Sequence, residues 1–220
     1  MNNKTKFTVT TLLSILLGFL GSIATVNFRT LAWPEGFLFP LQPVAISLKN
    51  VEIYHEIALL FFLVLLSMLL GKRSTERAGW FFFIFAVSRS ARFLFQYLLS
   101  GWPSSLASTD LIGLFPTATT SPVWAFLVLS VLVIVLSILI INFSKRIRYL
   151  RFRGKELLFL IIGAALCYAS FITDKHFSMR DFSSKEIHAD FNWILYTIGC
   201  VSIAVGILYF FFHNKKSRQK

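Results

Sequence analysis

Residues 122–143 read PVWAFLVLSVLVIVLSILIINF, a run of 22 residues without a single charged side chain. A helix of about 20 apolar residues is long enough to cross the hydrocarbon core of a bilayer, which is roughly 30 Å thick. Five further runs of similar character occupy residues 7–27, 52–71, 79–100, 156–173 and 192–212. The sequence therefore predicts an all-α, polytopic membrane protein with about six transmembrane helices.

The composition agrees with this fold class. Of the 220 residues, 56% are hydrophobic and only 15% are charged, and 25 are phenylalanine, which is far more apolar than a typical soluble domain. No internal repeat, low-complexity linker or long block of charge divides the chain. We therefore expect a single transmembrane domain over residues 1–220.

The basic residues predict the orientation of the chain. The formal net charge is +12, and 15 of the 22 Lys and Arg lie before residue 7, just after residue 71, within 145–155 or after residue 214. The alternate segments, 28–51, 101–121 and 174–191, hold five. Loops rich in Lys and Arg stay in the cytoplasm, so both termini are predicted to be cytoplasmic. This distribution explains the basic charge without nucleic acid, and no nucleic-acid partner is expected.

The first span has an alternative interpretation as a signal peptide cut after Ala24. In either case residues 28–51 are expected outside, as an interfacial segment rich in proline and aromatic residues. Cys167 and Cys200 fall inside predicted spans, and we interpret both as packing residues. No cofactor is predicted.

Two other outer loops carry polar residues. The loop 101–121 has Asp110 as its one charged residue and is expected to rest against the membrane. The loop 174–191 gathers acids and histidines, namely Asp174, His176, Asp181, His188 and Asp190. No pair among them has a recognised ligand spacing, so a solvated polar loop is favoured over a metal site.

Two arginines interrupt the third span. Arg89, Arg92 and Gln96 are spaced i, i+3, i+7 and share one helical face. A charge inside a membrane is costly, so these side chains should meet a partner or a ligand. The second span begins with Glu52, Tyr54, His55 and Glu56 at a comparable depth. This placement predicts a Glu56–Arg92 ion pair.

With Glu56 as the only nearby carboxylate, one arginine would be left to bind an anionic lipid phosphate, which suits the two-pronged guanidinium group. The alternative is structural: both arginines could be neutralised by carboxylates and backbone carbonyls merely to fix a pair of helices. The residues alone leave both readings open.

Residues 50–143 resemble the C-terminal half of the prolipoprotein diacylglyceryl transferase family. Tyr54 and Glu56 open one helix, a basic turn with Gly79 follows, and Arg92-Phe93 come in the next helix, in the order that the family shows. Ser121 and Pro122 stand where the family's final helix starts. The chain departs from the family pattern at Gln96, Ser100 and Thr119, and it lacks the family's His-Gly-Gly segment.

The resemblance implies a protein of a bacterial plasma membrane, connected with lipoprotein biogenesis, that binds an anionic phospholipid such as phosphatidylglycerol from the outer leaflet. It implies His55, Glu56 and Arg92 as candidate catalytic residues; together with the shared helical face it leaves Tyr54, Arg89, Arg92 and Gln96 as candidate phosphate-binding residues, with Gln96 as a neutral donor. A lipoprotein or another membrane protein would be a further partner. Without the His-Gly-Gly segment, His55 is the one nearby candidate for a general base.

Three function classes follow. The first is a transferase-like enzyme that acts on a phospholipid, and the second is a non-catalytic lipid-binding or assembly partner with a degenerate form of the same fold. The third is a small transporter, which the lack of an inverted repeat disfavours.

Overall fold

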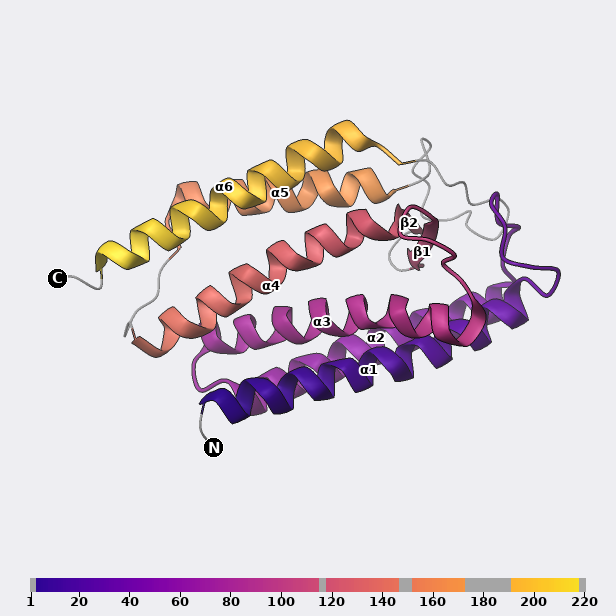
Figure 1. Ribbon diagram of the computed structural model, residues 1–220, viewed down its shortest axis with the longest axis horizontal. Coiled ribbons are helices and arrows are strands. Elements are labelled where there is room, and N and C mark those ends of the chain that lie inside the picture. The colour runs from indigo at the N-terminus through magenta and orange to yellow at the C-terminus, as the bar shows by residue number, and fades with distance from the viewer. Residues whose placement is uncertain (1–2, 115–117, 147–151, 173–190, 218–220) are drawn as a thin grey trace. The chain divides into compact units, whose positions relative to one another are not determined.

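The computed structural model of the chain describes residues 3–114, 118–146, 152–172 and 191–217 (Figure 1). In these residues it contains six helices that are long and apolar enough to cross a membrane. They are α1 (Asn3–Ala32), α2 (Ile46–Leu70), α3 (Ser74–Ser100), α4 (Val123–Arg146), α5 (Gly154–Phe171) and α6 (Trp193–Ser217). The predicted all-α multi-pass fold is confirmed, and each helix covers most or all of its predicted span.

The first outer segment is shorter than expected. α1 continues to Ala32, and Trp33 still donates its backbone N–H to the Arg29 carbonyl at 2.8 Å. The helix stops there because a residue that precedes proline, here Pro34, disfavours the helical conformation. Since α2 already begins at Ile46, the non-helical part is 33–45 and not 28–51, and Arg29 lies inside a helix.

α3 ends at a glycine turn. The Gly101 N–H donates to the Tyr97 carbonyl at 2.8 Å, and Gly101 has a φ of 70°, the left-handed conformation that commonly terminates helices. Trp102 and Pro103 follow, and proline cannot continue a helix. The chain therefore leaves α3 sharply at residues 100–103.

The loop 101–121, which was expected to rest against the membrane, contains a β-hairpin. Strand β1 (Thr109–Gly113) pairs antiparallel with β2 (Thr119–Pro122), with Asp110 opposite Ser121. All four residues of β2 are buried. The pairing satisfies backbone groups that would otherwise be buried without partners.

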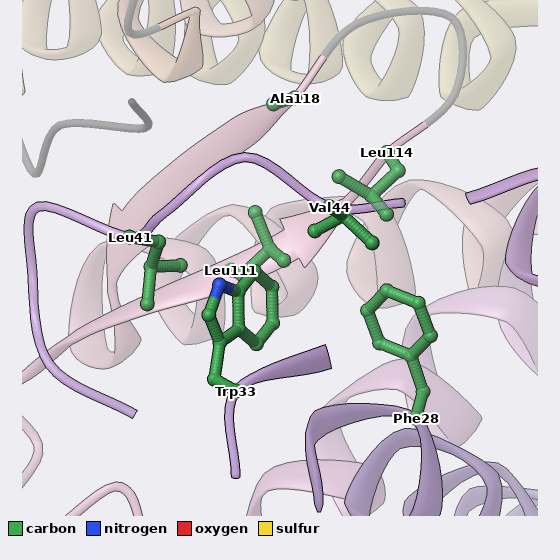
Figure 2. Close-up of a cluster of buried hydrophobic side chains, with 7 residues drawn as sticks. All are labelled: Phe28, Trp33, Leu41, Val44, Leu111, Leu114 and Ala118. Carbon is green, nitrogen blue, oxygen red and sulfur yellow. The ribbon is translucent and has the colours of Figure 1, made fainter. Parts of the chain in front are cut away.

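Contacts between Cα atoms divide the chain into two compact units. The first unit comprises Met1–Phe62, Val87–Leu127 and Phe171–Phe191, and thus holds α1, the first part of α2, the second part of α3 and the hairpin. Its core contains seven buried residues, namely Phe28, Trp33, Leu41, Val44, Leu111, Leu114 and Ala118 (Figure 2). The Trp33 indole N–H donates to the Gln42 carbonyl at 2.9 Å, which folds the 33–45 segment onto this core.

The second unit comprises Leu63–Ala86, Val128–Ser170 and Asn192–Lys220. Glycines let its helices approach closely: a Cβ on Gly199 would lie 2.7 Å from the Cys167 sulfur and 2.9 Å from the Gly163 carbonyl oxygen. Cys167 and Cys200 are free thiols with their sulfurs 3.9 Å apart. His213 on α6 lies 2.8 Å from the buried Glu156 of α5.

Candidate functional site

The polar face of α3 lies in the interior of the first unit. Arg92 is 5% exposed, Gln96 is completely buried, and Arg89 one turn earlier is partly buried. α1 packs closely beside this face, since a Cβ on Gly18 would lie 2.6 Å from the Ser88 carbonyl oxygen. The side chains of Arg92 and Gln96 are therefore enclosed by protein.

A buried ion pair joins α1 to the hairpin. The Arg29 Nη2 lies 2.6 Å from Asp110 Oδ1, and neither residue is more than 7% exposed. The same carboxylate oxygen accepts the Leu111 backbone N–H at 2.9 Å. The Arg29 guanidinium also lies 4.1 Å from the centre of the Phe37 ring. Asp110 is thus held by a charge, by a backbone donor and by the position of β1.

Strand β1 also contacts α3 and α2. Arg92 Nη2 donates to the Ile112 carbonyl at 3.2 Å. On the other side, a Cβ on Gly113 would lie 2.8 Å from Glu56 Oε1, so this carboxylate reaches close to the backbone of β1. Three helices and one strand therefore meet at a single group of charged side chains.

We call this group the arginine–carboxylate cluster, and in the described part of the chain it contains Arg29, Arg89, Arg92, Glu52, Glu56 and Asp110. Arg29 and Glu52 both border one small cavity, and Asp110 is bonded to Arg29. Glu56 and Arg92 line the same small cavity, while the hydrogen bond described for the Arg92 guanidinium goes to Ile112.

The cluster corrects the expectation that Glu56 is the only nearby carboxylate. Asp110 reaches Arg29 because its loop folds as a strand against the helices, and Glu52 lies one turn before Glu56 on the buried face of α2. Three arginines and three carboxylates balance formally among the described residues. A surplus positive charge is therefore no argument for an anionic ligand here.

Several buried polar atoms of this region have no hydrogen-bond partner among the described residues. They are Arg29 Nε and Nη1, Arg92 Nε, both amide atoms of Gln96, Asp110 Oδ2 and the Trp102 indole nitrogen. A buried polar group that stays unsatisfied costs roughly 1–3 kcal/mol. Arg29, Arg92, Glu52 and Glu56 also line a cavity of about 10 Å³, which has room for about one water molecule. One water molecule in this cavity would satisfy some of these groups.

An open pocket of about 320 Å³ lies beside Arg29. We call it the Arg29 pocket; its wall includes Thr30, Trp33, Phe37, Ser100 and Trp102. Phe37 touches both tryptophans edge-on, with ring centres 5.4 Å from Trp33 and 5.6 Å from Trp102. The pocket thus has aromatic walls, and two of its lining residues, Arg29 and Trp102, carry buried N–H groups without a described acceptor.

The predicted site residues divide into three groups. Glu56, Arg89 and Arg92 belong to the arginine–carboxylate cluster, and Gln96 is buried on the same face of α3. His55 lies at its edge, with Nδ1 3.6 Å from Glu52 Oε2 and a side chain that is 36% exposed. Tyr54 is 68% exposed and lies outside the buried face of α2.

Sequence reasoning missed Arg29, Asp110 and Trp102 as site residues. One signal for Asp110 was present, because a single acid in a 21-residue loop without Lys or Arg needs a partner. No group of three metal-ligating side chains occurs among the described residues. The acids and histidines of loop 174–191 that were weighed as ligands, Asp174, His176, Asp181, His188 and Asp190, lie outside the described residues.

The first unit thus contains a buried, charge-balanced cluster and, beside it, an open aromatic pocket. The pocket is lined by Arg29 and Trp102, whose buried N–H groups have no described acceptor. Comparison with known proteins gives no match, whether with family models, with curated proteins or with solved structures, so the chemistry of this region has to indicate what the chain does.

Proposed function

We propose that this multi-pass membrane protein binds an anionic phospholipid, with the phosphate of the headgroup in the Arg29 pocket. One observation carries the proposal. The pocket is lined by Arg29 and Trp102, which are donor-only side chains, and both have N–H groups without an acceptor among the described residues. A phosphate supplies the acceptor oxygens that these donors lack.

The other polar groups of the pocket strengthen this choice. The Thr30 hydroxyl donates to the Val26 carbonyl at 3.0 Å, and the Ser100 hydroxyl donates to the Gln96 carbonyl at 2.9 Å. Their hydrogens are therefore engaged, and the donors left for a ligand are the buried N–H groups of Arg29 and Trp102, which a phosphate reaches by a side-chain movement at the pocket wall. Trp33 and Trp102 are of the type that occupies membrane interfaces, where phospholipid headgroups lie.

In this proposal the α3 residues have a supporting role. Arg92 is not part of the wall of the Arg29 pocket, and its guanidinium holds the Ile112 carbonyl of β1. Strand β1 in turn positions Asp110, which fixes one end of the Arg29 guanidinium. Arg92 thus helps to position Arg29 through the hairpin. The sequence had led us to expect that Arg92 contacts the phosphate directly.

The test measures lipid retention by native mass spectrometry. Phosphatidylglycerol, phosphatidylcholine and diacylglycerol with identical acyl chains are supplied to wild type and to Trp102→Phe, which keeps a ring and removes the donor. Wild type should retain phosphatidylglycerol best and diacylglycerol least. Trp102→Phe should weaken phosphatidylglycerol binding about tenfold, because a hydrogen bond to a charged group contributes roughly 1.5–3 kcal/mol.

The matched control is Trp193→Phe, since Trp193 is 42% exposed and lies in the second unit. It should bind as wild type does. Equal retention of all three lipids by wild type would refute the proposal, whatever the variants do.

A phospholipid-dependent transferase is the second candidate, and the His55–Glu52 pair is the observation that favours it. Nδ1 of the partly exposed His55 lies 3.6 Å from Glu52 Oε2, just beyond hydrogen-bond distance, so a small closure would let the carboxylate orient a histidine that accepts a proton from an incoming thiol. His55→Gln should then abolish diacylglyceryl transfer to a cysteine-containing peptide and leave phosphatidylglycerol binding intact. The absence of transfer by wild type defeats this candidate.

A further inference from the structure

A second hollow lies beside the last turns of α3, within the first unit. It is open, has a volume of about 380 Å³ and is lined by Ser90, Leu94, Tyr97, Pro103, Leu106 and Val123, among others. We call it the α3 groove. Among the described residues, its wall has no acidic, basic or amide side chain, which distinguishes it from the Arg29 pocket.

The shape of the α3 groove is fixed by hydrogen bonds. Opposite α3, the Leu106 carbonyl accepts the Trp124 N–H at 2.9 Å, and the Ser108 carbonyl accepts the Val123 N–H at 3.1 Å. The Ser108 hydroxyl contacts the hydroxyls of Ser104 and Ser105 at 3.1 and 3.0 Å. The segment that forms the outer wall is thus tied to the start of α4, and the groove exists without a ligand.

The groove has a buried floor and an exposed apolar rim. Phe93 and Val123 at the floor are 4% and 1% exposed, and Phe93 packs edge-on against Phe126 at 5.4 Å. Leu94, Tyr97 and Leu106 at the rim are 52–62% exposed. The α3 side lies at the end of the candidate membrane span Ser74–Ser100, a position that suits contact with a lipid.

We infer that the α3 groove binds one acyl chain of the phospholipid whose headgroup occupies the Arg29 pocket. This inference rests on the proposed function. The two sites adjoin at one turn of the chain: Ser100 and Trp102 line the pocket, whereas Tyr97 and Pro103 line the groove. A lipid seated in both sites straddles the turn at Gly101, where a Cβ would meet no atom within 4 Å.

An acyl chain that moves from the bilayer into the groove passes between two apolar media, so it gains nothing from the hydrophobic effect. Binding in the groove therefore has to come from packing. A fixed groove that stays poorly filled loses van der Waals contacts along its walls, and a bound chain restores them. A transmembrane helix of a partner protein is the wrong size for a hollow of about 380 Å³, since a helix with its side chains is roughly 10–12 Å across. A flexible acyl chain fits the available space.

The experiment uses phosphatidylglycerol with a photoreactive diazirine in one acyl chain, added to the full-length protein in bilayers. After irradiation, labelled residues are mapped by peptide mass spectrometry. Labelling should concentrate on Leu94, Tyr97 and Leu106 and should exceed that of Leu98 at least fivefold. Leu98 is the internal reference, because it is 66% exposed on the same helix but does not line the groove.

Two variants fill the groove from opposite walls. Ser90→Trp does so from α3, and Leu106→Trp does so from the segment 103–106. The Leu106 side chain is 62% exposed, so the fold should tolerate a larger ring there. Both should lower labelling of Leu94 and Tyr97 at least fivefold, whereas the control Leu98→Trp should leave it unchanged. Labelling spread evenly over exposed residues, or unaffected by Leu106→Trp, overturns the inference.

A second probe separates this inference from the proposed function. Diacylglycerol with the same photoreactive chain lacks the phosphate. If it labels the groove as strongly as phosphatidylglycerol does, the acyl-chain site stands and the phosphate site fails. If phosphatidylglycerol is retained over diacylglycerol but its labelling is even, the phosphate site stands and the acyl-chain site fails.

Discussion

Neutralising one member of the Arg29–Asp110 pair should strongly destabilise the protein, and neutralising both should be better tolerated. Arg29→Gln leaves the Asp110 carboxylate, which is 0% exposed, with the Leu111 N–H as its remaining described hydrogen bond. Asp110→Asn leaves a guanidinium that is 7% exposed beside the charge of Arg92. In each case a buried charge loses its counterion.

The expected magnitude follows from this burial. Removing one partner of a buried ion pair costs about 3–5 kcal/mol, because the remaining charge stays desolvated. We expect Asp110→Asn to cost about 3 kcal/mol, near the lower end of this range. Its amide oxygen can still accept the Leu111 N–H, and the Glu52 carboxylate still attracts the Arg29 guanidinium. The double variant Arg29→Gln/Asp110→Asn holds two neutral amides and should cost about 1–2 kcal/mol, close to that of a substituted hydrogen bond.

The assay is equilibrium unfolding in mixed micelles for wild type, both single variants and the double variant. The free energies form a double-mutant cycle, and we expect a coupling of at least about 4 kcal/mol, because the two single losses together far exceed the loss in the double variant. Glu35→Gln is the control, because Glu35 is exposed and should change stability by less than about 0.5 kcal/mol. Strict additivity of the two single variants would refute the pairing and, with it, the role of the hairpin in positioning Arg29.

Three further predictions test the fold. In a cysteine-free background, a cysteine at Arg153 should resist a membrane-impermeant maleimide applied from outside, because the basic loop is predicted to be cytoplasmic; labelling there would reverse the orientation. Gly18→Ala should destabilise by about 1–3 kcal/mol, since its Cβ would lie 2.6 Å from a carbonyl oxygen, whereas Gly154→Ala has open space and should be neutral in the same unfolding assay. A membrane-permeant oxidant should convert Cys167 and Cys200 into an intramolecular disulfide, seen as the loss of both alkylatable thiols, because their sulfurs lie 3.9 Å apart; two persistent thiols would contradict the α5–α6 packing.

The sequence by itself determined the class of the protein and the positions of its helices. The length of an apolar run is a local property, so residues 122–143 predict a spanning helix without reference to any other part of the chain. The common face of Arg89, Arg92 and Gln96 is equally local, because three residues on one helix are related by its period alone. The ends of α1 and α2 were placed less well, since polar residues such as Arg29 and Lys49 can lie in helices that extend past the apolar core.

Only the tertiary structure decided what the arginines contact. Asp110 and Arg29 are 81 positions apart, and their pairing depends on the fold of loop 101–121 into a hairpin against three helices. That hairpin forms because its strands satisfy each other's backbone groups and bury β2, and neither gain is visible in a polar loop read by composition. The Arg29 pocket and the α3 groove likewise take their walls from the helix ends and the segments that join them, because a turn at Gly101 brings those walls together. Charge partners and cavities arise from such long-range packing, so local sequence rules predict that a buried arginine needs a partner but cannot say which residue supplies it.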